Sequence, residues 1–384
     1  MLNPKLKLNF EHMEEGFRIA TANFFLGAFL IFLLAGCTNS RNYMYPSWYE
    51  LERQRVCRHV SQRKTIKFLV SKNKIHAIAP VHFGGLPCKM KEIKEVADKV
   101  GAIIYEDAAQ AFGASFSDGS KIGSCKYSDM TVFSFHPVKS IATGEGGVVT
   151  TNDKNIYEKL LRLRNHGIER NQDNFQLKSK SITNEINNPW YYEMQELGYN
   201  YRITDIQCAL GLSQLKKIDK FINKRRELAK KYDSAFENLK NCKPVQKNMR
   251  DFSSNHLYVL KINFKKLNKT RASLMEEFES AGIVTQVHYI PVISHPYFQK
   301  KNYKENNFPN SYEYYNGALS IPLFYDLTDK QQLYIIDQVK KFIVEMRHDK
   351  HIFSGALHTG TCVAQTESPS SFVAHPTSPD ACDI

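Results

Sequence analysis

Hydrophobic and polar positions alternate along the chain in patterns that predict strands and helices in succession. Residues 75–82 (IHAIAPVH) form an apolar run that predicts a buried strand, and Gly84 and Gly85 predict a turn after it. In residues 90–100 (MKEIKEVADKV) the apolar side chains recur at helical spacing. A second strand is expected at 102–105. Strand, helix and strand in this order predict a βαβ unit and therefore a parallel sheet.

The pattern continues to about residue 346. It predicts strands at 131–135, 148–151 and 256–264, and helices at 153–164, from Thr204 or Asp205 to 218, at 270–281 and at 329–346. Between 167 and 195 the chain is polar and loop-like. From 347 to 384 the composition shifts to Ser, Thr, Pro, His and Ala without periodicity, which is typical of a disordered tail.

Composition and charge narrow the possible functions. With 384 residues, of which 42% are hydrophobic and 24% charged, the chain can bury a sizeable core. The net charge is +13, but basic residues mostly alternate with acidic ones along the expected helices, so we expect no nucleic-acid binding. The eight cysteines form no C-x-x-C pair and have no zinc-type spacing. They indicate reduced thiols in a cytoplasmic protein and no metal site.

One segment favours a different location. Residues 19–36 form an apolar run followed by Cys37, which resembles a signal peptide with a lipoprotein cleavage box or a short membrane anchor. The segment before the run contains three glutamates, where a signal peptide has a short basic stretch. We therefore expect no membrane association, with an anchor through residues 19–37 as the alternative. Residues 1–74 form an atypical N-terminal segment.

Candidate chemistry concentrates between residues 101 and 147. The strand at 102–105 ends in the acidic pair Glu106 and Asp107. Lys139 lies between the strand at 131–135 and a glycine cluster at 144–147. Ligands of parallel sheets bind beyond the carboxyl ends of the strands, so this arrangement predicts a cofactor site.

Pyridoxal phosphate is a cofactor that suits these side chains. It requires an amine that binds its aldehyde, a carboxylate that keeps its pyridine nitrogen protonated, and donors for its phosphate. Lys139, Asp107 and Ser134 can supply these three groups. We favour Asp107 over Glu106 as the carboxylate, because alternation along a strand turns only one of the two toward the ligand.

These residues resemble the motifs of the DegT/DnrJ/EryC1/StrS family of nucleotide-sugar aminotransferases. The family pattern is E-D-x-A-x-x-x-G, then S-F-x-x-x-K, then a glycine-rich turn. In this chain the three parts are Glu106 to Gly113, Ser134 to Lys139, and Gly144 to Gly147. In all, the resemblance extends over about residues 75–345.

The resemblance implies a role for each matching residue. Lys139 and Asp107 would be catalytic and would also bind the cofactor, with Gln110 beside the ring hydroxyl and Ser134 at the phosphate. Asn200 of one subunit would reach the cofactor phosphate of the other. This implies a homodimer with shared active sites.

Three further runs, at 162–168, 189–202 and 287–292, resemble the branch of the family that acts in pseudaminic acid synthesis. That branch moves an amino group from an amino acid, expected to be glutamate, to the C4 keto group of a UDP-linked 4-keto-6-deoxy sugar. His136, His288 and Tyr289 are then candidates for contact with the UDP-sugar.

The resemblance also implies the PLP-dependent transferase fold type I, an α/β fold. We expect a mostly parallel, doubly wound sheet in a large domain at 75–240, and a small α+β domain at 241–346. In this family a Gly-Thr phosphate-binding turn precedes the large domain, but residues 1–74 contain no recognisable counterpart. Two alternatives follow: an active enzyme with a truncated or frame-shifted start, or a catalytically impaired relative that lacks the phosphate-binding loop.

Overall fold

The computed structural model describes residues 18–21, 75–300 and 305–343, and of residues 18–21 only the backbone. Most of the apolar run at 19–36, together with Cys37 and the expected tail at 347–384, lies outside these described residues. Among the described helices, none combines the length and the apolar character that crossing a membrane requires.

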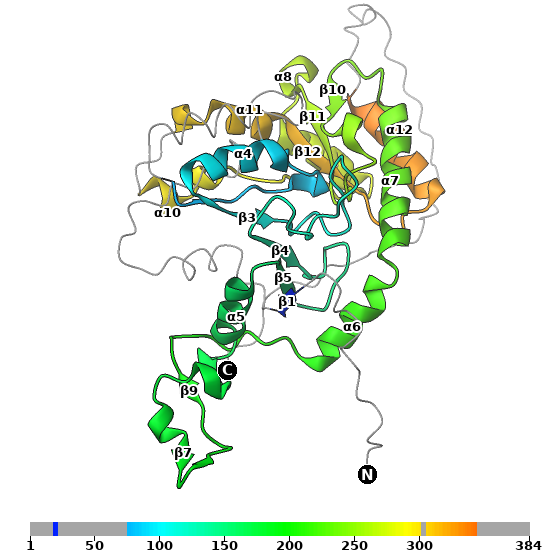
Figure 1. Cartoon of the computed structure of the whole chain (residues 1–384). Coiled ribbons are helices and arrows are strands. Elements are labelled where there is room, and N and C mark those ends of the chain that lie inside the picture. Colours follow the sequence, from blue (N-terminus) through cyan, green and yellow to red (C-terminus); the bar gives the residue numbers. More distant parts are fainter. Residues whose placement is uncertain (1–17, 22–74, 301–304, 344–384) are drawn as a thin grey trace, which may run out of the picture. The chain divides into compact units, whose positions relative to one another are not determined.

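A five-stranded sheet carries the candidate site residues at the carboxyl ends of two inner strands. Its order is β1-β5-β4-β3-β2, with β1 at Arg18–Thr21, β2 at Ala77–Ile78, β3 at Ile103–Asp107, β4 at Met130–Ser134 and β5 at Gly147–Thr151 (Figure 1). The pairs β2–β3 and β3–β4 are parallel, whereas β4–β5 and β1–β5 are antiparallel. The described sheet is thus mixed rather than mostly parallel. The chain joins β4 to β5 without a helix, and a parallel return would need a long crossover connection, usually helical.

The helix α4 (Met90–Val100) connects β2 to β3, as the hydrophobic spacing predicts. Its buried face consists of Met90, Ile93, Val96 and Ala97, which pack in one core with Ile104 of β3. Gly101 ends the helix with φ of 66°, a left-handed conformation that glycine adopts without strain.

The strand β2 is shorter than the predicted strand at 75–82. Proline has no N–H to donate to a neighbouring strand, so Pro80 interrupts the ladder. Beyond it, Val81 pairs with Asp107 through a single parallel bridge.

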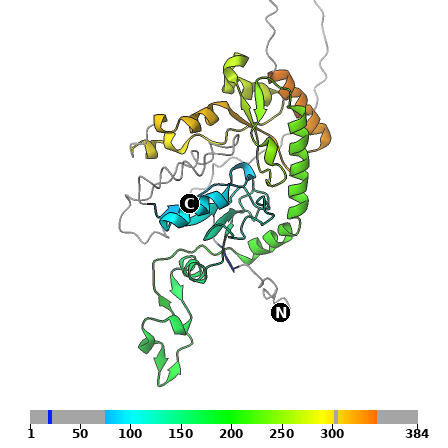
Figure 2. The ribbon, with the colours of Figure 1, turned by 45° about the horizontal axis from the view of Figure 1, so that its top comes forward.

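After β5 the chain forms α5 (Lys154–Leu163), whose first turn is capped by the carboxylate of Asp153. The polar stretch that follows contains four short strands, which pair among the described strands only with one another: β6 (Ile168–Glu169) with β9 (Glu193–Met194), and β7 (Ile182–Thr183) with β8 (Ile186–Asn187). It also contains two single-turn helices, η3 (Gln172–Asn174) and η4 (Lys178–Lys180). Both views show this segment apart from the five-stranded sheet (Figures 1 and 2).

Two helices then lead to the second sheet. The first, α6 (Asp205–Leu215), begins after Thr204, which forms a reciprocal capping box with Gln207. The second is the long helix α7 (Ile218–Ala235).

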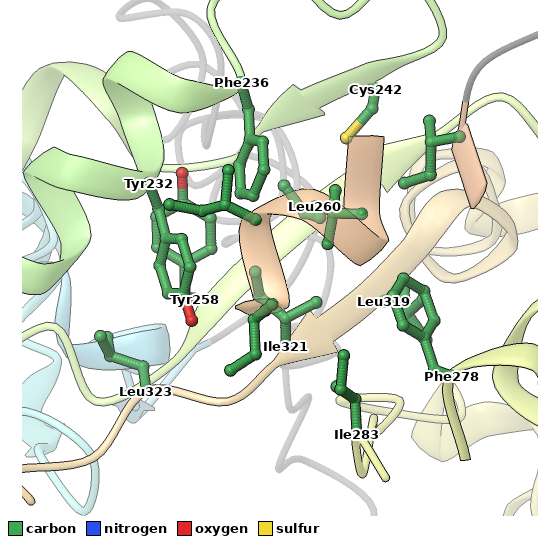
Figure 3. Close-up of a cluster of buried hydrophobic side chains, with 14 of the residues drawn as sticks. Tyr232, Phe236, Cys242, Tyr258, Leu260, Phe278, Ile283, Leu319, Ile321 and Leu323 are labelled. Carbon is green, nitrogen blue, oxygen red and sulfur yellow. The ribbon is translucent and has the colours of Figure 1, made fainter. Parts of the chain in front are cut away.

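The second sheet is antiparallel, in the order β10-β11-β12, with β10 at Cys242–Pro244, β11 at Tyr258–Ile262 and β12 at Ala318–Ile321. The helices α7, α9 (Arg271–Ser280) and α12 (Asp329–Ile343) contribute to its core. Figure 3 shows this core around the fully buried Tyr232, Phe236, Tyr258, Leu260 and Phe278. The shorter helices are η2 (Phe83–Gly85), η5 (Lys247–Met249), α8 (Phe264–Leu267), η6 (Val292–Ser294), α10 (Pro296–Gln299), η7 (Glu305–Asn307) and α11 (Pro309–Gly317).

A buried ion pair joins α7 to the chain just before β11. The guanidinium of Arg250 donates two hydrogen bonds to the carboxylate of Asp233, from Nε at 2.9 Å and from Nη2 at 3.0 Å. The hydroxyl of Tyr258 donates a third at 2.8 Å. All three side chains are buried, so the charges are compensated inside the protein and not by water.

Removing one member of this pair should destabilise the protein strongly. Asp233→Ala leaves the buried guanidinium without a counter-charge, and we expect a loss of about 3–5 kcal/mol in the free energy of unfolding. Urea unfolding measures this loss. The exposed pair of Lys230 and Asp251, 2.7 Å apart, provides the matched control. Asp251→Ala should leave the unfolding midpoint almost unchanged, because exposed pairs contribute little. Equal effects of the two substitutions would contradict the assignment.

Candidate active site

Asp107 and Lys139 occupy the carboxyl ends of two neighbouring strands. Asp107 is the last residue of β3, and Lys139 lies in the loop after β4. Burial raises the pKa of the Asp107 carboxyl, while the N–H of Ala109 and the charge of Lys139 oppose that rise. Burial lowers the pKa of the Lys139 amine, and the charge of Asp107 opposes that change. The two groups therefore act on each other within one partly desolvated site.

Alternation along β3 gives the two acidic residues different surroundings. Glu106 is fully buried, and its carboxylate accepts hydrogen bonds from the hydroxyls of Ser128 and Thr131. Its other oxygen lies 2.6 Å from Nε2 of His82. Because the N–H of Cys88 donates to Nδ1 of His82 at 2.9 Å, the imidazole proton resides on Nε2 and points to Glu106. Glu106 is thus saturated by structural partners.

Asp107 keeps one carboxylate oxygen for a ligand. Its Oδ1 accepts the N–H of Ala109 at 2.9 Å, and in the described part of the chain no hydrogen bond reaches Oδ2. Its backbone is fixed because the carbonyl accepts the N–H of His82 and the N–H donates to the carbonyl of Pro80, both at 2.9 Å. The His82–Glu106 pair thereby holds the strand end that presents Asp107.

Gln110 connects three segments that are distant in the sequence. Its side-chain oxygen accepts the N–H of Gly84 at 2.7 Å, and its amide nitrogen donates to the hydroxyl of Tyr289 at 3.0 Å. Its backbone carbonyl accepts the hydroxyl of Ser254 at 2.8 Å. Gln110 thus has a fixed orientation, and Tyr289 lies at the same site.

His288 also lies close enough to Lys139 to be affected by its charge. Its Nδ1 is 2.8 Å from the hydroxyl of Ser320 in β12. Burial, and then the charge of Lys139, lower the pKa of His288 to about 4, so the imidazole is neutral at physiological pH.

The described contacts link the remaining predicted residues less directly to Lys139 and Asp107. Ser134 is buried at the end of β4, and its hydroxyl accepts the N–H of His136 at 3.3 Å. His136 lies 3.8 Å from the carboxylate of Glu145, across the loop that carries Lys139. Asn200 is exposed before α6, and no interaction in the described ranges joins it to Lys139 of the same chain.

The structure adds one histidine that the sequence patterns did not single out. His256 lies just before β11 and is affected by the charges of Lys139 and Arg225. The sequence places it at the start of a strand, where a histidine is unremarkable, and no motif marks it. Only the tertiary contact reveals its proximity to the site.

The chain matches the family model of the DegT/DnrJ/EryC1/StrS aminotransferases over residues 46–340. That range covers more than half of the sequence. The chain belongs to this aminotransferase family. The predicted family is thereby confirmed, and the match also extends into the segment before residue 75.

Individual relatives agree with this assignment. The spore coat polysaccharide biosynthesis protein SpsC of Bacillus subtilis is 38% identical over 70% of this chain and 66% of its own length. A UDP-4-amino-4,6-dideoxy-N-acetyl-beta-L-altrosamine transaminase of Campylobacter jejuni is 35% identical over 71% of this chain and 67% of its own length. The chain spans about two thirds of the length of these curated relatives.

A solved structure confirms the fold. Helicobacter pylori PseC, an aminotransferase involved in the biosynthesis of pseudoaminic acid, superimposes with a TM-score of 0.64 at 28% identity, over 72% of this chain and 70% of its own. The predicted α/β fold of type I is therefore correct.

Pyridoxal phosphate is the cofactor of this family. The sugar aminotransferase Spr1654 of Streptococcus pneumoniae, solved in its PLP form, is 25% identical with a TM-score of 0.62 over 72% of this chain and 71% of its own. The residues of the present site fit such a group. They offer an amine with a lowered pKa, a carboxylate of which one oxygen has no hydrogen bond to a described residue, and the unpartnered buried Nδ1 of His256.

Acid should destabilise the protein partly through His288. Its pKa is lowered from 6.5 to about 4, so between these values the unfolded chain binds a proton that the folded chain does not. The free energy of unfolding therefore decreases, through this group, as the pH falls from 6.5 toward 4. His288→Gln should reduce the slope in this window, measured by urea unfolding at a series of pH values.

The exposed His295 supplies the matched control for this series. His295→Gln should keep the wild-type profile. If His288→Gln also keeps it, the imidazole is not desolvated as described.

Proposed function

We propose that this family member moves an amino group from glutamate to the C4 keto group of a UDP-linked 4-keto-6-deoxy sugar, as in pseudaminic acid synthesis. The observation that carries the proposal is that Asp107 ends β3 and Lys139 follows the parallel neighbouring strand β4. The transaminase of Campylobacter jejuni and PseC of Helicobacter pylori support the choice of sugar pathway.

Lys139 would bind the cofactor aldehyde and carry the proton. Desolvation lowers the pKa of its amine, which increases the neutral fraction that can act as nucleophile and base. Nζ of Lys139 would take the proton from the donor's α-carbon and would later return one to the sugar carbon. When bound, pyridoxal phosphate supplies the electron-accepting ring that makes this α-proton acidic.

Asp107 would hold the charge of the pyridine nitrogen. Its free Oδ2 can accept the N–H of a protonated ring, and a carboxylate at this position favours the charged ring. Gln110 would lie beside the ring hydroxyl and Ser134 at the phosphate. His136, His288 and Tyr289 would contact the UDP-sugar. Two contacts support this for the last two residues: the charge of Lys139 acts on His288, and Gln110 donates a hydrogen bond to Tyr289.

We also propose a homodimer in which Asn200 of one subunit completes the phosphate site of the other. Two observations support it. Asn200 is exposed, and the helix α6 that follows has no buried residue although it is rich in apolar side chains, with Ile206 exposed to 84%. A helix of this composition is typical of a protein–protein contact. A cytoplasmic location is consistent with the four cysteines of the described ranges, which form no disulfide there.

The first test is the visible absorption of the purified protein with added pyridoxal phosphate. We expect a band of lysine-bound cofactor in the wild type that bleaches with glutamate. Lys139→Ala should lack the band and lose at least about 10²-fold to 10⁴-fold in turnover of a UDP-linked 4-keto-6-deoxy sugar, because the proton carrier is gone. A GDP-linked 4-keto sugar tests the nucleotide choice.

Lys126→Ala is the control for this experiment, since Lys126 is paired with Asp118 at 2.6 Å on the surface. It should behave as the wild type. A folded wild-type protein that shows no band would instead support the catalytically impaired relative.

Hybrid dimers test the shared active site. A hybrid of one Lys139→Ala chain and one Asn200→Ala chain has both lesions in one site and none in the other, so it should recover about half of the wild-type activity. The two chains carry different purification tags so that the hybrid can be isolated.

A hybrid of Lys139→Ala with Asp107→Asn provides the control. It should stay inactive, because Lys139 and Asp107 serve the same site and each site then contains a lesion. If the first hybrid is equally inactive, Asn200 acts within its own chain.

A further inference from the structure

Four consecutive polar residues, Ser253 to His256, are buried beside the candidate active site. Ser253, Ser254 and Asn255 have no exposed surface, and His256 is 7% exposed. Burial of polar side chains is unfavourable unless each finds a hydrogen-bond partner. The first three do. Ser253 accepts the N–H of Asn255, Ser254 donates to Gln110, and the side-chain amide of Asn255 donates to the carbonyl of Arg250.

The backbone of His256 is fixed on both sides. Its N–H donates to the carbonyl of Gly84 at 3.0 Å, and its carbonyl accepts a hydrogen bond from the buried guanidinium of Arg225 at 3.4 Å. Arg225 holds the neighbouring chain too, because it donates to the carbonyl of Leu323 at 2.8 Å. The position of the imidazole is therefore determined by the scaffold before any ligand arrives.

This arrangement requires the turn formed by η2 to approach the backbone of Ser254 closely. The N–H of Ser254 donates to the carbonyl of Gly85 at 3.0 Å. Gly85 has φ of 90°, and a Cβ at that position would lie 2.1 Å from the hydroxyl oxygen of Ser254. Only glycine fits there.

The imidazole of His256 is the exception in this segment. Its Nδ1 is buried and has no hydrogen-bond partner. An unsatisfied buried nitrogen costs about 1–3 kcal/mol, so its retention indicates a partner that is bound from outside. The N–H of His256 donates to Gly84, and the N–H of Gly84 donates to the side chain of Gln110, so the histidine lies beside the residues of the site. The charge of Lys139 also acts on the imidazole. Burial and this charge hold its pKa well below the ordinary range, so the ring is neutral and carries one N–H donor.

We propose that His256 is a further ligand-binding residue of the active site, whose imidazole donates a hydrogen bond to an oxygen of the molecule bound beside Lys139. The inference rests on the proposed function for the identity of that molecule. The oxygen belongs either to pyridoxal phosphate or to one of the two substrates, and the test separates these sources.

The test compares His256→Leu, which removes the donor at similar volume, with His256→Gln, which retains an N–H donor. The first measurement is urea unfolding without ligand. Because Leu removes an unsatisfied polar group, His256→Leu should be at least as stable as the wild type. A marked loss of stability would show that the imidazole has a structural partner and would overturn the proposal. This arm does not depend on catalysis, so it remains decisive even if the proposed function fails.

The second measurement is binding. Pyridoxal phosphate is titrated by absorbance, and glutamate and the UDP-sugar are compared through KM and kcat. His256→Leu should weaken one of these ligands about tenfold, the effect of losing one well-placed hydrogen bond, while His256→Gln retains most of the affinity. A weaker Kd for pyridoxal phosphate assigns the oxygen to the cofactor, and an unchanged Kd with a raised KM assigns it to that substrate.

His295→Leu, at an exposed histidine, controls for the loss of an imidazole as such. If His256→Leu binds all three molecules as the wild type does, the proposal is wrong. A wild type that takes up no pyridoxal phosphate contradicts the proposed function. The urea unfolding of His256→Leu then tests the role of His256 by itself.

Discussion

The buried hydrogen bond between His82 and Glu106 is the contact on which the candidate site depends. It joins the turn after β2 to the end of β3, and it satisfies both side chains away from water. The hydrogen bonds of Glu106 are all made on one face of the strand. Asp107, the next residue, therefore points to the other face, where Lys139 lies. A single structural pair thus fixes both the sheet edge and the direction of the candidate carboxylate.

A second set of contacts joins the five-stranded sheet to the antiparallel one. Gly84, Gly85 and Gln110 on one side meet Ser254 and His256 on the other through several hydrogen bonds. Hydrogen bonds have strict geometric requirements, so this junction determines relative position more sharply than apolar packing does. The proposed ligand-binding histidine is therefore held beside Gln110 largely by backbone groups of Gly84 and Gly85.

Much of this organisation could be predicted from the sequence, because it depends on local periodicity. Helix α4 follows from its apolar spacing, and alternation along β3 correctly gives Glu106 and Asp107 different surroundings. The antiparallel return from β4 to β5 was not predicted, since the hydrophobic pattern of a strand does not encode its direction. His256 was missed for a related reason. Its significance arises chiefly from Lys139 and Gly84, which are more than a hundred positions away, and no spacing within the segment itself reports them. The assignment of ligand roles to Gln110, Ser134 and Asn200 remains a prediction from the family.

The close approach at Gly85 has a consequence for how sequence variation in this protein should be interpreted. Any side chain at that position would displace the hydroxyl of Ser254 and would crowd the backbone nitrogen of Asn255, next to His256. A variant library scored only by turnover would therefore report Gly85 as if it belonged to the catalytic machinery, although it offers no group to a reactant. Scoring the same library for abundance as well would separate the residues that perform chemistry from those that keep two parts of the scaffold in register.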